Sequence, residues 1–330
     1  MLDRRQFLTA SVAAAALAPA AARAASTEGA KLSALLDAFF EEDLQRVPES
    51  ATELGLDKGA RAGLKARLWD VSATGIARDK AANADRIARL KAVDRKSLSG
   101  MDAVNYDTVL FVEEATRPLL DLDLGGTDGF SPSCYVLSPI TGAYQRIPVF
   151  LDTKHSIETA NDADAYLERL GAFSGALDGN TERFRHDVAK GAIPPDFLID
   201  ITIGQLEALR VSADKSGLVS SVETRAKAKG LNGYGAKAGA IYDAKVGPAL
   251  DRQIATLKAA RPQATHDAGI WRFKDGDAFY AANLKYTTTT SMTPKEVHQL
   301  GLDQAAEIGA RLDVLLKKAG LSQGTVGERI

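Results

Sequence analysis

Histidine and cysteine, the side chains most typical of metal sites and thiol catalysis, are rare in this 330-residue chain. The four histidines are widely separated, at His155, His186, His266 and His298. Zinc peptidases pair two histidines one helical turn apart, with a glutamate between them that activates the metal-bound water. No histidine here has a second one at that spacing. His155 and Glu158 could share a helical face, but two ligands do not make a zinc site, so the sequence predicts none.

Other catalytic motifs are weaker. Cys134 has no histidine near it in the sequence, and a lone cysteine is typical of a small buried hydrophobe. Gly233-Tyr234-Gly235 resembles a dinucleotide-binding loop only superficially, because no predicted strand precedes it. A calcium loop beginning at Asp121 would need a glutamate at its twelfth position, where Pro132 stands. These motifs therefore favour structural roles.

Side chains suited to positioning a substrate lie near the C-terminal end. Four consecutive threonines, Thr287 to Thr290, are β-branched and predict extended backbone, along which a peptide could bind by strand addition. The alternative is that the threonines satisfy local backbone groups and the preceding Tyr280 fills core. The candidates for a cleft wall are Tyr144, Tyr280, Lys285, Thr287, Thr288, Thr289 and His298.

Long helices must carry these side chains. Thr293-Pro294-Lys295-Glu296 predicts a helix start, with a threonine cap, proline at the first helical position and a glutamate that closes a capping box. Apolar residues follow at helical spacing until Gly320 stops the helix. Similar patterns predict helices over 31–47, 48–54, 79–98, 102–120, 162–190 and 242–257, and one opened by Pro194-Pro195. The predicted fold is all-α, a multi-helix array with long irregular loops and at most a short β segment.

The stretch 121–148 breaks this rhythm with glycines and prolines, which predict a long irregular connection. Loops of this length in a compact domain are often functional or packed over a cleft. It contains Cys134, Tyr135 and Tyr144 and is the best loop candidate for a substrate-facing surface. A loop that simply packs against helices is the alternative.

The N-terminus has the pattern of an export signal. Arg4-Arg5 precedes the short apolar run 9–22, which matches a twin-arginine signal with a cleavage site near Ala24. We therefore expect a signal peptide over 1–24, a helical domain over 25–330 and a periplasmic or secreted protein. Cleavage would leave a net charge of −4, which gives no electrostatic case for nucleic acid or an anionic membrane as a partner. A single cysteine excludes an internal disulfide.

Three segments of the sequence resemble one bacterial family. The clearest runs from Tyr280 through the threonines and TPKEVHQLGL to Gln323–Arg329; the others are PESATELG at 48–55 and KGAIPPDFLIDITIGQLEAL at 190–209. Their order resembles the family catalogued as domain of unknown function 885, whose members look like secreted, mostly helical zinc metallopeptidases. Lys285 stands where arginine is commoner in that family, which keeps the charge but loses bidentate recognition of a carboxylate.

The resemblance implies that this chain corresponds to the N-terminal portion of an exported zinc metallopeptidase. In the family the metal lies on an HExxPGHH-type helix downstream of the threonine segment, and the sequence reaches Ile330 without one. Zinc is thus implied for the full-length family but not for this chain, which we expect to be inactive alone. The alternative is a helical module that binds a peptide or small molecule without catalysis.

Overall fold

The computed structural model describes residues 27–126 and 132–330, and the predicted signal peptide lies outside this range. The described chain is all-α, as predicted from the sequence. It contains no β-strand; two isolated bridges, Gly126 with Ser133 and Ser138 with Thr141, pin the irregular stretch before α6. The helices, in chain order, are α2 (Thr27–Arg46), α3 (Pro48–Glu53), α4 (Ala73–Lys91), α5 (Gly100–Leu122), α6 (Ala143–Thr153), α7 (Ala160–Ala189), α8 (Asp196–Leu209), α9 (Gly217–Lys227), α10 (Tyr234–Ile241), α11 (Gly247–Ala260), α12 (Gly276–Thr288), α13 (Pro294–Lys318) and α14 (Val326–Arg329).

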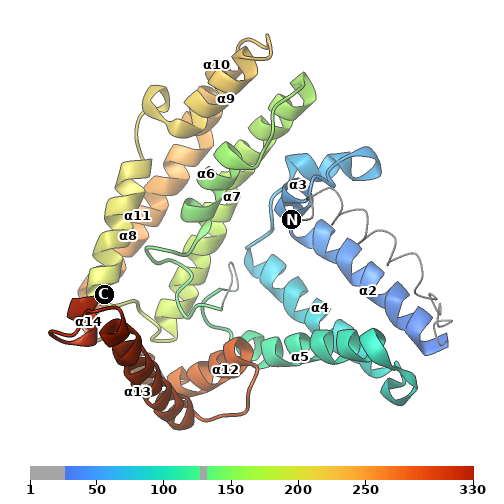
Figure 1. Cartoon of the computed structure of the whole chain (residues 1–330). Helices are drawn as coiled ribbons and strands as arrows, with labels where there is room; N and C mark the ends of the chain where they lie inside the picture. Colours follow the sequence, from blue (N-terminus) through green and yellow to red (C-terminus); the bar gives the residue numbers. More distant parts are fainter. Residues whose placement is uncertain (1–26, 127–131) are drawn as a thin grey trace, which may run out of the picture.

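Helices α6 to α11 form the larger side of the molecule, with α7 at its centre (Figure 1). Apolar residues recur along α7 at helical spacing, and Tyr166, Leu170 and Phe173 are fully buried. A π-helical turn, η4 (Tyr242–Val246), joins α10 to α11, so the predicted helix over 242–257 is continuous but locally widened. The main hydrophobic core therefore surrounds a single long helix.

Helices α2, α4 and α5 form the other side, around a smaller core that includes Leu32, Phe39, Leu90 and Tyr106 (Figure 1). The short α3 and the 3-10 helix η1 (Gly59–Ala66) connect this side to α7. The two sides meet along α4 and α7, and α12 packs against α5 at their base.

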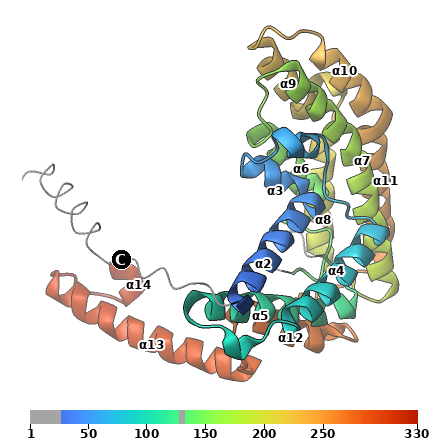
Figure 2. The same cartoon turned by 90° about the vertical axis from the view of Figure 1, so that its right-hand side faces the viewer.

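The last two helices leave the body. Helix α13 has no buried residue, and the main neighbour it packs against is the short α14. Figure 2 shows α13 projecting from the rest of the molecule, on the side that faces the reader in Figure 1. We call residues 289–330 the arm and the preceding described residues the body.

Three predictions about local structure were wrong. The helix predicted over 79–98 is α4, which begins six residues earlier, after the Ser72 cap, and ends at Lys91. The irregular stretch is shorter than 121–148, because α6 begins at Ala143 and includes Pro148. The threonine run is not extended at its start: Thr287 and Thr288 form the last turn of α12, and the chain leaves the helix at Thr289, with φ 55°, so Thr289 and Thr290 lie outside it. The hydroxyls of Thr287 and Thr288 donate to the Asn283 and Leu284 carbonyls, which keeps β-branched residues helical.

Candidate functional site

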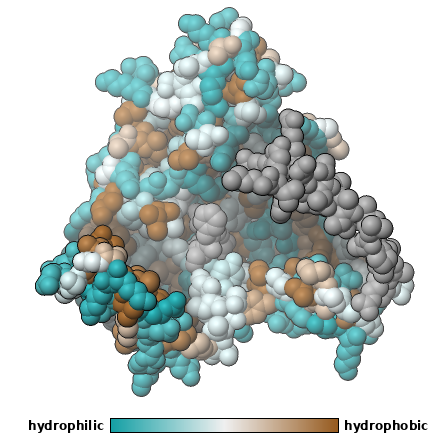
Figure 3. Space-filling view, viewed as in Figure 1, coloured by the Kyte–Doolittle hydropathy of each residue, from teal (hydrophilic) through white to brown (hydrophobic). Residues whose placement is uncertain are grey.

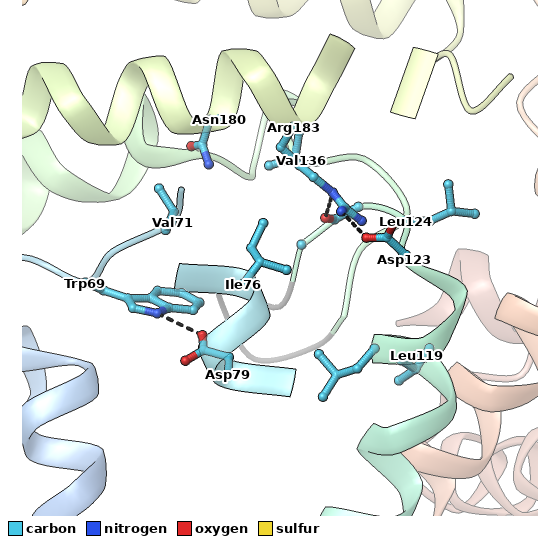
Figure 4. A pocket seen from close by; sticks show the side chains of 13 residues that line it. Trp69, Val71, Ile76, Asp79, Leu119, Asp123, Leu124, Val136, Asn180 and Arg183 are labelled. Atoms are coloured by element: carbon cyan, nitrogen blue, oxygen red, sulfur yellow. Dashed lines mark hydrogen bonds and ion pairs between the residues drawn. The ribbon is translucent and has the colours of Figure 1, made fainter. Parts of the chain in front are cut away.

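A pocket lies where the two sides of the body meet. Its apolar walls come from the segment before α4, from α4 and α5, and from the irregular stretch (Figure 4). They are formed by Trp69, Val71, Ile76, Leu119, Leu124 and Val136, while Asp79, Asp123, Asn180 and Arg183 supply the polar groups. The cavity itself has a volume of about 60 Å³. This leaves room for one small apolar group, whereas sites for whole drug-sized ligands span roughly 300–1,000 Å³.

Asp79 provides an acceptor on one wall. The Trp69 indole Nε1 donates to Asp79 Oδ2 over 3.1 Å, which fixes both side chains (Figure 4). Burial raises the pKa of the Asp79 carboxyl, and nearby Arg46 and the indole hydrogen bond oppose that rise. The second carboxylate oxygen of Asp79 is therefore the acceptor left for a ligand.

Arg183 on α7 organises the opposite wall. Its Nε donates to the Gly125 carbonyl over 2.9 Å and its Nη1 to Asp123 Oδ1 over 2.5 Å. Burial would raise the pKa of Asp123, but Arg183 outweighs it and holds that pKa below its usual value. Gly125, with φ 65°, must be glycine, because a Cβ there would lie 1.8 Å from the Ser133 carbonyl. The Arg183 guanidinium thus holds the loop at Asp123 and Gly125 in place, and two of its three nitrogens are hydrogen-bonded to that loop.

Behind this wall, Asp187 is buried 3.1 Å from the Arg183 Nε, and its Oδ2 accepts from the Gly125 N–H over 3.1 Å. Burial raises the pKa of Asp187 to about 6 despite that cation. Such a perturbed carboxyl is a feature of functional sites and also of structural ion-pair networks. Since both its oxygens have partners within the described chain, we assign Asp187 to the support of the loop.

Asn180 offers the free donor of the pocket. It is 2% exposed, and its Oδ1 accepts from the Ala143 N–H over 2.7 Å, which fixes the amide orientation. Its Nδ2 donates to no group in the described chain and points towards the space between α7 and α4 (Figure 4). A ligand carbonyl or carboxylate would satisfy it.

The pocket is therefore suited to binding an apolar group that carries a hydrogen-bond acceptor. Among the described residues, its polar lining consists of two carboxylates, one amide and one guanidinium. Figure 3 shows that the face between the two sides of the body is hollowed.

Tyr144, one of the predicted site residues, is a structural residue in α6. It is buried, and its hydroxyl oxygen lies 2.7 Å from both the Ser138 carbonyl and Gln205 Oε1. Burial raises the pKa of its phenol. It ties the irregular stretch to α8 and does not line the pocket.

The other predicted residues lie on α12 and the arm. Tyr280 is half exposed and shares a helical face with Thr287, seven residues on, whereas Lys285 points well away from both. Lys285 has no ion pair within the described chain. His298 is exposed on α13. The structure thus brings together only Tyr280 with Thr287, and none of these residues with the pocket.

Sequence reasoning singled out the stretch 121–148, which supplies Asp123, Leu124, Gly125, Gly126 and Val136 to the pocket, but it missed the rest of the lining. Trp69, Asp79, Asn180 and Arg183 come from three separate segments, and no motif links them. The single hint was polarity: Asn180 and Arg183 interrupt the buried face of α7, where a polar residue needs a partner.

His155, the histidine that could share a helical face with Glu158, is hydrogen-bonded at both ring nitrogens, one 2.9 Å from the Asp162 carbonyl and the other 2.9 Å from Arg169 Nη1. Across residues 27–126 and 132–330, no group of three or more histidine, cysteine, aspartate or glutamate side chains could hold a metal ion. No helix in the same ranges is long and apolar enough to cross a membrane.

Comparisons with known proteins agree with this architecture. A crystal structure described as that of a "putative lipoprotein" from Colwellia psychrerythraea superposes with a TM-score of 0.78 at 22% sequence identity. The match covers 92% of this chain and 53% of that one, so this chain spans about half the length of the solved relative. No curated protein matches the chain. The family model described as "Bacterial protein of unknown function (DUF885)" matches residues 48–330. The chain therefore belongs to the DUF885 family.

Proposed function

We propose that this chain is the N-terminal part of an exported zinc-dependent peptidase and forms one wall of its substrate cleft. The observation that carries the proposal is its place in the family: residues 48–330 match the DUF885 model, while the chain covers only 53% of its solved relative. The hollow face and the pocket beside it are consistent with a role in holding a peptide.

In this proposal the metal and the general base come from polypeptide outside the 330 residues. Zinc would supply the activated water that attacks a peptide carbonyl. The residues present do not fit that ion, so no step of the reaction is assigned to them. Their part is to bind and orient the substrate: Asn180 would donate to a substrate carbonyl, and the apolar walls would hold a side chain.

The first test is the intact mass and zinc content of the mature protein isolated from its host. We expect a mass near twice that of this chain, one zinc ion per molecule and peptidase activity. The purified 330-residue chain should have neither stoichiometric zinc nor activity. Zinc bound tightly to the 330-residue chain would overturn the proposal.

Export is part of the same proposal and rests on Arg4-Arg5 and the apolar run after it. We expect the mature protein to begin near Ala25 and to be found outside the cytoplasm. Replacing both arginines with lysine should leave the unprocessed chain in the cytoplasm. Processing that continues unchanged would argue against the twin-arginine route.

The pocket favours a second candidate function, a helical binding module without catalysis. Asn180→Asp tests it, since the variant keeps the acceptor for Ala143 and replaces the free donor with an acceptor. N-acetyl amides of apolar amino acids should raise the melting temperature of the native chain but not of this variant. Asn232→Asp, on an exposed turn, is the control. No shift in any of these proteins would remove the pocket as a binding site.

A further inference from the structure

Helix α13 carries an apolar stripe that is mostly exposed in the described chain; α14 packs against this helix, and Leu312 and Leu316 are half-buried. The members of the stripe fall within less than half of the helix circumference, so they share one face of the helix. They are Val297, Leu300, Ala305, Ile308, Leu312, Leu315 and Leu316. Ile308 is 54% exposed and Leu315 60% exposed. Figure 3 shows apolar side chains over this part of the molecule, at the lower left. A face of this length is normally covered in a soluble protein.

Small residues make one edge of the stripe suited to close helix packing. Gly301, Ala305 and Gly309 are four residues apart and lie in one row. A Cβ added at Gly301 or Gly309 would meet nothing within 4 Å, so the space beside this row is open. A facing helix could therefore approach α13 closely along this row.

Several charged residues on α13 already pair within the arm. Arg311 lies 3.7 Å from Glu307, and Asp313 lies 2.7 Å from Lys317 and 2.5 Å from Arg329. The feature of α13 that calls for a partner is therefore its apolar stripe, and a covering helix needs a matching apolar face.

The solved relative shows where such a partner could come from. The part of this chain outside the match, 8%, is shorter than the arm, so some of the arm lies inside the match. The relative therefore shares part of the arm while having nearly twice the length. The arm projects on the side of the molecule that faces the reader in Figure 1, which is also the side of the hollow face (Figures 1 to 3). A segment packed between the arm and the body would lie over that face.

We propose that the apolar stripe of α13 is the docking surface for a helix of the polypeptide that completes the family's fold. This inference rests on the proposed function, because it takes the partner to be the half of the longer relative that this chain does not cover. On docking, that half closes over the hollow face and makes the body one wall of a cleft.

The test compares amide hydrogen exchange in the 330-residue chain and in the native mature protein from its host. Amides of residues 294–318 should exchange at least 100-fold more slowly in the native protein. Equal, rapid exchange in both proteins would overturn the proposal. Protection already present in the 330-residue chain, with a doubled mass by light scattering, would also overturn it and assign the stripe to a second copy.

Matched variants expressed in the host separate docking from a change of charge. Leu300→Asp, Ile308→Asp and Leu315→Asp together place three carboxylates on the stripe and should abolish the protection. Gln299→Asp, Ala306→Asp and Ala310→Asp place three on the opposite face of the same helix and should leave it intact. Loss of protection in both variants, or in neither, contradicts the assignment.

The same samples distinguish this inference from the proposed function. If α13 is protected in a native protein that has neither zinc nor peptidase activity, the peptidase proposal is wrong and the docking surface is supported. If the native protein has zinc and activity but α13 exchanges freely, the docking surface is wrong and the peptidase proposal is supported.

Discussion

Helices α7 and α13, the two longest in the described chain, begin with the same capping motif but differ in how deeply they are buried. Each opens with a capping box, Thr159 with Asp162 in α7 and Thr293 with Glu296 in α13. Each then carries an apolar stripe at helical spacing. Yet α7 buries half of its residues in the main core, and α13 buries none.

The difference teaches that caps and periodicity make a helix, while burial depends on what is available to cover it. Helix α7 is enclosed by α6, α9, α10, α11 and η1. Even a charged residue, Arg169, is fully buried there because it has four hydrogen-bond acceptors. The stripe on α13 is aliphatic, without the aromatic residues that α7 buries, and it is mostly exposed within the described chain. Four predictions test whether body and arm differ in this way.

The largest difference in unfolding free energy between body and arm should come from replacing one arginine in each. Arg169→Met leaves the Leu64 and Arg67 carbonyls and Thr52 without their donor, and we expect a loss of about 4 kcal/mol in unfolding free energy. Arg311→Met on α13, where the side chain is 75% exposed, should change it by less than about 0.5 kcal/mol. Urea denaturation of the 330-residue chain measures both.

Replacing one leucine in the body and one in the arm compares the same unfolding free energy for apolar side chains. Leu170→Ala opens a cavity in the main core and should cost about 3 kcal/mol, whereas Leu315→Ala removes a side chain that is already 60% exposed and should cost less than about 0.5 kcal/mol. A similar cost for both, by urea denaturation, would show that the arm packs in the isolated chain.

The body should also lose stability on mild acidification. Burial lowers the pKa of His155 to about 4. Both ring nitrogens of His155 are hydrogen-bonded, so neither is available to take up a further proton. The stability conferred by neutral His155 is fully present above pH 6.5 and is lost as the pH falls towards 4, by about 3 kcal/mol. The denaturation midpoint of the body, followed by tryptophan fluorescence between these pH values, should fall with it.

Two variants check the sign of that effect. His155→Gln should flatten the dependence between pH 6.5 and 4. Asp187 acts in the opposite direction, because its raised pKa of about 6 adds stability as the pH falls from 6 to 4. Asp187→Asn should therefore make the loss steeper, and a shallower loss would contradict the assignment.

The smallest difference in stability should come from removing the N-terminal caps of α7 and α13. Thr159→Ala should lower the global stability by about 1 kcal/mol, because α7 unfolds with the core. Thr293→Ala should leave the global midpoint unchanged and speed amide exchange only in the first turn of α13. A shift of the global midpoint by Thr293→Ala would mean that the arm is coupled to the body.

Local sequence signals identified most of the helices but not the pocket. Pro48, the Thr293 capping box and Gly320 stop or start helices by chemistry within a few residues, so their positions could be predicted. The extended backbone predicted for the threonine run was wrong at Thr287 and Thr288. Their β-propensity is outweighed by the helix that precedes them, whose carbonyls accept hydrogen bonds from both hydroxyls.

The sequence by itself determined the all-α class, the ends of several helices, the absence of a paired-histidine zinc motif and the resemblance to the family. These depend on backbone preferences, residue spacing and composition, which act locally. Only the tertiary structure decided that Asn180 faces a pocket with Asp79, that Tyr144 is structural and that the α13 stripe is mostly exposed. Those features depend on which surfaces meet across long separations in the chain, and packing sets those contacts.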